Sequence, residues 1–147
     1  MASLERSIVI QASVESVFEC MDDPVNQPKI TSDAARIEDV EKLPQGGTQS
    51  KFIYKIGPGM EVKGRLTTVD YIPNQRIVYD FSGGLKGNIW WLFESIDDDS
   101  SRVTYKADYH LDMPLLGDTL ANLAAKFSEE EVETQLANLK ELMERGV

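Results

Sequence analysis

The stretch PLLGDTLANLAAKFSEEEVETQLANLKELMER, residues 114–145, decides the fold. Its apolar residues recur at helical spacing in two stripes. The first stripe is Leu116, Leu120, Leu123 and Phe127, and the second is Val132, Leu136, Leu139 and Met143. Because the preceding chain reads almost entirely as β-strand, the pattern predicts one long helix that lies across a face of an antiparallel sheet.

The two stripes are offset from each other along the helix. Between them, Ser128-Glu129-Glu130-Glu131 fits the capping box S-x-x-E, which marks a helix start. The sequence therefore predicts a kink or break near Lys126–Ser128, and the alternative is an unbroken helix with a wide apolar face. In the broken form, Leu116–Phe127 would be an adjustable cavity wall and Val132–Met143 its anchor on the sheet.

The rest of the chain supplies the sheet and one short helix, followed at Pro24 by a second short helix or a turn that Pro28 keeps short. Ser13 is a good N-cap, and Val14, Val17, Phe18 and Met21 follow it at helical spacing until Asp22-Asp23-Pro24. Alternating apolar residues predict strands at residues 3–10, 36–43, 48–56, 60–71, 76–82, 87–96 and 102–111. Since short turns join most of them, neighbouring strands should be antiparallel, and the fold class should be α+β.

Composition limits the class of partner. With 147 residues the chain is expected to form a single domain spanning 1–147. Fifteen basic against 25 acidic residues give a net charge of −10, which argues against nucleic acid and anionic lipid surfaces as partners. The single cysteine, Cys20, excludes an intrachain disulfide. No apolar run approaches a membrane span or a signal sequence, so a cytoplasmic protein without integral membrane association is expected.

The order of strand, short helices, antiparallel strands and long C-terminal helix resembles the helix-grip fold of the START/Bet v 1-like (SRPBCC) superfamily, especially its polyketide cyclase/dehydrase-like branch. The similarity covers essentially the whole chain. The segments that carry it are Ala12–Phe18, Asp22–Pro24, Trp91-x-Phe93-Glu94, Arg102–Tyr105 and Leu136–Lys140. The chain differs from the pattern of this superfamily at Pro28-Lys29-Ile30, where such proteins commonly carry a tryptophan near the mouth of the cavity. These motifs identify a fold better than a function.

The resemblance implies a curved sheet that grips the long helix, two short helices after the first strand, and an apolar cavity between sheet and helix. The lining it implies is Phe52, Tyr54, Val62, Leu66, Ile77, Tyr79, Phe81, Trp91, Phe93, Tyr105, Tyr109, Leu120, Ala124 and Phe127. Tyrosines among apolar residues suit a ligand with rings and a few hydroxyl or carbonyl groups.

The sequence offers little acid–base or metal chemistry. The only histidine, His110, shares strand parity with residues expected to face solvent. Asp97-Asp98-Asp99 lacks the ligand spacing of a calcium loop, and Gly83–Gly87 lacks that of a nucleotide loop. Cys20 has no histidine near it in sequence to activate it. We therefore predict no metal and no cofactor, and the sequence identifies no catalytic residue.

A catalytic alternative rests on tyrosines. A tyrosine beside an arginine could polarise a ketone and steer a cyclisation. The candidates are Tyr54, Tyr79, Tyr105 and Tyr109, with Arg65 and Glu94 as charged partners, although strand parity places both charged residues on the outer face. The tyrosines are better explained as core or binding residues.

Three functional hypotheses follow. The leading one is binding or transport of a small apolar ligand, similar to a lipid, quinone or polyketide, in the cavity. The second is a polyketide cyclase or dehydratase acting in the same cavity. The third is a protein-interaction module that uses the helix and an outward-facing Trp90 with Leu92, a surface that would also suit a weak homodimer.

Overall fold

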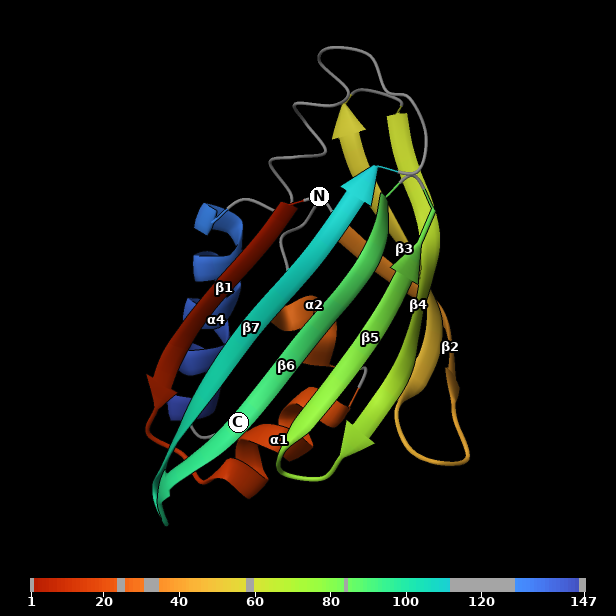
Figure 1. The fold of residues 1–147 in the computed structure, drawn as a ribbon. Helices are drawn as coiled ribbons and strands as arrows, with labels where there is room; N and C mark the ends of the chain where they lie inside the picture. Colours follow the sequence, from red (N-terminus) through yellow and green to blue (C-terminus); the bar gives the residue numbers. More distant parts are fainter. Residues whose placement is uncertain are drawn as a thin grey trace.

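The computed structural model describes residues 2–23, 26–30, 35–57, 60–83, 85–111 and 129–145. The described strands form one antiparallel sheet in the order β1-β7-β6-β5-β4-β3-β2, with the helices on one side of it, behind the sheet in Figure 1. The strands are β1 (Ala2–Ile10), β2 (Ala35–Lys42), β3 (Thr48–Gly57), β4 (Met60–Ile72), β5 (Arg76–Ser82), β6 (Leu85–Asp97) and β7 (Ser100–Leu111). The helices are α1 (Val14–Asp22), α2 (Gln27–Ile30) and α4 (Glu129–Glu144). The predicted α+β architecture is confirmed. We call the sheet face toward the helices the concave face and the other the convex face.

Helix α1 forms where the capping residue predicts it. The Ser13 hydroxyl oxygen accepts a hydrogen bond from the backbone N–H of Ser16 at 3.2 Å, which satisfies one of the free donors at the helix start. The buried stripe of α1 is Val14, Val17, Phe18 and Met21, as the spacing predicts. This stripe packs against β6 and β7 on the concave face.

Helix α4 is the described part of the predicted C-terminal helix. It packs on β1, β7 and α2. Its most buried side chains are Val132, Leu136, Leu139 and Leu142, with Met143 partly buried beside them. The second predicted stripe is therefore an anchor on the sheet. The first stripe and the predicted joint at Lys126–Ser128 lie outside the described residues.

Polar contacts tie α4 to the strand beneath it. The Lys140 Nζ donates to the backbone carbonyl of Val9 at 3.0 Å and pairs with Glu144 at 2.6 Å. The Glu144 carboxylate also accepts from the backbone N–H of Gln11 at 2.9 Å. Chiefly through the hydrogen bond from Lys140, these contacts lower the pKa of Glu144 below its ordinary value.

Replacing Glu144 by Gln should make stability less dependent on acid pH. A carboxyl whose pKa is lowered by folding stabilises the folded state above its unfolded pKa, here about 4.5, and loses that contribution as the pH falls through the lower, folded value. Glu144→Gln should therefore be slightly less stable than wild type near neutral pH and equally stable in strong acid. Urea unfolding across this range measures the difference. Glu141→Gln is the matched control, because Glu141 pairs along the same helix with Arg145, at 4.0 Å. Equal pH dependence in the two variants would contradict the prediction.

Two glycines allow unusually close contacts within the sheet. A Cβ atom on Gly87 would lie 2.0 Å from the carbonyl oxygen of Asp108 and 2.8 Å from the Cα of Tyr109, in the neighbouring strand. A Cβ on Gly64 would lie 2.1 Å from the carbonyl oxygen of Ser82. Since these are backbone atoms, any side chain would force the strands apart.

Two bulges change which residues face the helices. In β4 the register with β5 shifts between Thr68 and Asp70, so Tyr71 shares the concave face with Thr68. In β2 the register with β3 shifts between Glu38 and Glu41, and Asp39 there has a positive φ of 52°. A strict alternation along either strand would misplace the residues that follow.

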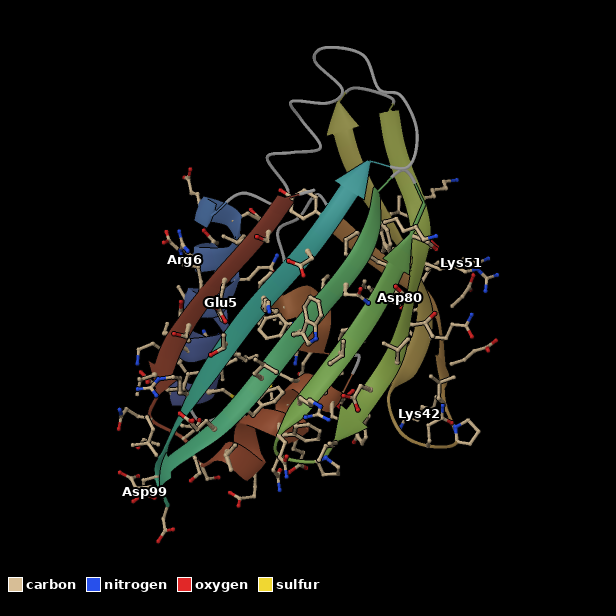
Figure 2. The ribbon with its side chains drawn as sticks, viewed as in Figure 1. Glu5, Arg6, Lys42, Lys51, Asp80 and Asp99 are labelled. Atoms are coloured by element: carbon tan, nitrogen blue, oxygen red, sulfur yellow. The ribbon has the colours of Figure 1, made fainter. Side chains whose placement is uncertain are left out.

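The convex face carries the residues that strand parity places there. Trp90 lies on it, half-buried, with the Lys106 Nζ 5.2 Å from the ring centroid. Glu94 is exposed and forms an ion pair with Arg102 at 2.9 Å. Figure 2 views this face and labels Asp80 on it. That Trp90 contacts another chain remains a prediction.

Candidate ligand-binding site

A group of polar side chains lies on the concave face where α1 ends beside β4 and β5. The Tyr71 hydroxyl donates to the Asp22 carboxylate at 2.8 Å. The Thr68 Oγ1 accepts from the backbone N–H of Thr48 at 3.0 Å and is also hydrogen bonded to the Tyr79 hydroxyl. We call Asp22, Thr68, Tyr71 and Tyr79 the Asp22 cluster. It joins the last residue of α1 to two adjacent strands.

Both tyrosines of the cluster stay protonated over the physiological range. Burial, the hydrogen bond to Asp22 and the charge of Asp22 raise the pKa of Tyr71 to about 12. Burial and then the charge of Asp22 raise the pKa of Tyr79 to about 12, against a lowering by the hydrogen bond from Thr68. Each phenol is therefore a hydrogen-bond donor rather than a base.

A small cavity adjoins the cluster. Its volume is about 20 Å³, which is room for one water molecule or one oxygen-bearing group. The described residues that line it are Met21, Asp22, Ile37, Val40, Thr48, Ser50, Leu66 and Tyr79. The lining thus combines hydrogen-bonding groups at one side with aliphatic side chains at the other.

A larger, open groove lies at the bulge of β2. Its volume is about 410 Å³, and its described lining is Asp39, Val40, Glu41, Gln49, Ser50, Lys51 and Arg65. Lys51 pairs with Asp39 at 3.2 Å and points to solvent (Figure 2). Val40 and Ser50 line both the groove and the small cavity.

Much of the concave face near α1 is filled by protein. The Phe18 ring of α1 packs edge-on against Phe93 at 5.2 Å and against Tyr71 at 5.5 Å. Trp91 and Tyr105 pack edge-on at 5.0 Å. These rings belong to one core shared by α1, α4 and the sheet.

The structure places the residues of the predicted lining as follows. Buried ones are Phe52, Ile77, Tyr79, Phe81, Trp91, Phe93 and Tyr105, and partly buried ones are Leu66 and Tyr109. Tyr54 and Val62 are opposite each other in the β3–β4 register, and their side chains lie outside the description. Leu120, Ala124 and Phe127 are outside the described residues. Of this set, Leu66 and Tyr79 line the small cavity, while Phe52 and Phe81 pair edge-on at 6.4 Å, apart from the main core.

Sequence reasoning misses three members of the Asp22 cluster. The sequence pattern marks Asp22 only as a helix end. Strict alternation along β4 gives no reason to turn Tyr71 inward or to single out Thr68. Thr68 shares the strand parity of Leu66, so only Tyr71 depends on the bulge between Thr68 and Asp70, and nothing local in the sequence marks that position.

Other candidate groups have ordinary explanations. Cys20 is half-buried, and burial raises the pKa of its thiol. In the acidic turn at the β6–β7 hairpin, the Asp97 carboxylate accepts from the backbone N–H of Asp99 at 2.8 Å. The side chain of His110 lies outside the description. Within the described ranges, no group of three or more acidic, histidine or cysteine side chains could hold a metal ion. No helix among those residues is long and apolar enough to cross a membrane.

Solved structures share the fold at low sequence identity. A protein from Thermus thermophilus aligns with a TM-score of 0.73 and 20% identity, over 99% of this chain and 100% of its own. The Zhui aromatase/cyclase from Streptomyces sp. R1128 aligns with a TM-score of 0.75 and 16% identity, over 98% and 94%. A START superfamily protein from Mycobacterium smegmatis gives 0.68 and 16%, over 95% and 98%. These likenesses confirm the helix-grip fold.

Comparison with curated protein sequences finds no match. The family described as polyketide cyclase/dehydrase and lipid transport matches residues 1–144. Because that match spans almost the whole sequence, this chain belongs to the polyketide cyclase/dehydrase and lipid transport family.

Proposed function

We propose that this chain binds a small apolar ligand that carries a neutral oxygen group, and that this oxygen lies at the Asp22 cluster. The observation that carries the proposal is the small cavity, whose volume of about 20 Å³ fits one oxygen and whose wall includes Asp22 and Tyr79. The hydrogen bonds from Tyr71 to Asp22 and from Thr48 to Thr68 hold the polar groups of the cluster in place, so a ligand oxygen that bonds to this wall is held in a fixed position.

The chemistry of the wall favours particular groups. The Tyr79 hydroxyl can donate to a carbonyl or hydroxyl oxygen, and the Asp22 carboxylate can accept from a hydroxyl. A carboxylate ligand is disfavoured there by the charge of Asp22, which already raises the pKa values of Tyr71 and Tyr79. The apolar part of the ligand would lie on the aliphatic side of the wall, at about 25 cal/mol per Å² of apolar surface removed from water.

Replacing Tyr79 by Phe should weaken binding of a hydroxylated probe selectively. We expect 2-naphthol to bind about fivefold less tightly to Tyr79→Phe than to wild type, because one hydrogen bond of about 1 kcal/mol is lost. Binding of naphthalene, which has the same rings without the hydroxyl, should not change. Fluorescence titration of both probes measures the two affinities.

Tyr105→Phe is the control variant, because Tyr105 is a buried tyrosine that packs on Trp91 away from the small cavity. It should leave the ratio of the two affinities unchanged. If Tyr79→Phe weakens both probes equally, Tyr79 supports packing and does not orient the ligand. If neither probe binds wild type, and native mass spectrometry of the purified protein finds no bound compound, the proposal fails.

A second candidate is a cyclase or dehydratase, and the Tyr71–Asp22 pair favours it. A protonated phenol beside a carboxylate can polarise a ketone in the cavity. The name of the similarly folded Zhui protein, aromatase/cyclase, gives the reaction class. Under this proposal, Tyr71→Phe and Asp22→Asn should abolish turnover of a polyketone while 2-naphthol still binds. Retained turnover in both variants would remove the candidate.

A further inference from the structure

The small cavity and the open groove are separated by a thin part of the sheet. Val40 and Ser50 are the described residues that line both spaces. Ser50 is buried, with 4% of its surface exposed, whereas Val40 is 39% exposed. One side of this wall therefore reaches the Asp22 cluster, and the other side is open to solvent.

The wall coincides with the bulge in β2. The register runs from Glu38 opposite Lys51 to Glu41 opposite Gln49, so Asp39 and Val40 together stand opposite Ser50. A bulge interrupts the backbone ladder at this point. Because β2 is the last strand of the described sheet, no further strand holds Val40 from the other side. Val40 can thus move with less loss of pairing than a residue inside the sheet.

The two spaces could hold different parts of one ligand, because the small cavity reaches the Asp22 cluster and the groove supplies the volume. The small cavity, at about 20 Å³, is too small for a ring. The groove, at about 410 Å³, lies within the roughly 300–1,000 Å³ that is typical of ligand pockets, but it is open to solvent and its described lining includes no residue of the Asp22 cluster. Of the two described residues that line both spaces, Val40 is the exposed one, so movement of its side chain would join them.

We propose that the β2 bulge is the entrance to the Asp22 cluster, that Val40 closes it, and that the bound ligand extends through it into the groove. The statement that the bound ligand extends into the groove rests on the proposed function. It defines the ligand as an elongated amphipathic molecule. The neutral oxygen lies at the inner end, the apolar middle lies against Ile37, Val40 and Leu66, and a polar outer end lies near Arg65 and Gln49.

Chemical labelling tests the entrance without any ligand. Ser50→Cys, in a Cys20→Ser background, places a thiol behind Val40, and iodoacetamide is a small neutral reagent for it. We expect labelling on the order of tenfold faster when Val40→Ala is added, and slower by a similar factor when Val40→Trp is added, because the labelling rate follows local opening. Val69, which lies in the β4 bulge and is 57% exposed, supplies matched controls. Val69→Ala and Val69→Trp should leave the rate unchanged.

Labelling rates that do not depend on residue 40, or that only follow the global stability of each variant, would overturn the entrance. The kinetics of 2-naphthol binding give a second readout that needs no new cysteine. For an entrance, Val40→Trp should slow both association and dissociation of the probe, whereas a residue that only contacts the bound ligand would change dissociation and leave association unchanged. If Val40 controls labelling but no probe binds, the entrance stands and the proposed function fails. If probes bind, but neither their binding rates nor the labelling rate depends on residue 40, the proposed function stands and the entrance fails.

Discussion

Trp91→Ala is expected to lower the free energy of unfolding by about 3–5 kcal/mol, whereas Trp90→Ala should lower it by about 1 kcal/mol or less. The two residues are adjacent in β6 and face opposite sides of the sheet. Trp91 is 2% exposed and packs edge-on against Tyr105 at 5.0 Å. Its removal leaves a large cavity in the core that α1, α4 and the sheet share. Trp90 loses a contact with Lys106 on the convex face.

Urea denaturation followed by far-ultraviolet circular dichroism measures both variants without relying on tryptophan fluorescence. The slope of the unfolding transition should stay close to that of wild type, since the same surface is exposed on unfolding. Similar losses in the two variants would mean that the convex face is covered as fully as the core. Size-exclusion chromatography of Trp90→Ala also tests whether this face contacts a second chain, and an unchanged elution volume would remove support for that contact.

Gly87→Ala is expected to lower the free energy of unfolding by about 3 kcal/mol or more. The added Cβ would meet the Asp108 carbonyl oxygen at 2.0 Å, and that atom belongs to the backbone of the paired strand. Relief requires β6 and β7 to separate locally, although both strands are held from their other sides by β5 and β1. The variant should therefore unfold at a markedly lower temperature or fail to accumulate.

Asn88→Ala is the control for this position, because Asn88 follows Gly87 in β6. Its side-chain amide donates hydrogen bonds to the backbone carbonyl of Tyr79 at 3.5 Å and to the carboxylate of Asp80 at 3.3 Å. Its loss should cost about 1 kcal/mol or less. Thermal unfolding followed by circular dichroism compares the two. A Gly87→Ala protein as stable as Asn88→Ala would show that the strands adjust to a methyl group without losing their pairing.

The regular parts of the fold were predictable because local chemistry determines them. Ser13 followed by Val14, Val17 and Phe18 fixes both the start and the buried side of α1. Alternation likewise places Ile77, Tyr79 and Phe81 of β5 on the buried face. These predictions depend on the spacing of apolar residues and on the capping residue, and both can be read from one short segment of sequence.

The Asp22 cluster could not be predicted in the same way. Tyr71 reaches the concave face only because the bulge between Thr68 and Asp70 shifts the parity of β4. Asp22 meets it only because α1 ends above β4, which is a tertiary relation between residues far apart in the sequence. The alternation of apolar and polar residues does not predict where a bulge inserts a residue. Helix capping does not predict which strand the end of the helix will contact.

The bulge in β2 has a consequence for molecules that meet one another in a concentrated solution. An edge strand with regular spacing can pair with the edge of another copy and begin an extended aggregate. Here the edge carries Glu38, Asp39, Glu41 and Lys42, all exposed, and the positive φ of 52° at Asp39 interrupts the regular spacing of its hydrogen-bonding groups. The same irregularity that thins the wall beside Val40 therefore also discourages self-association of the chain through its open edge.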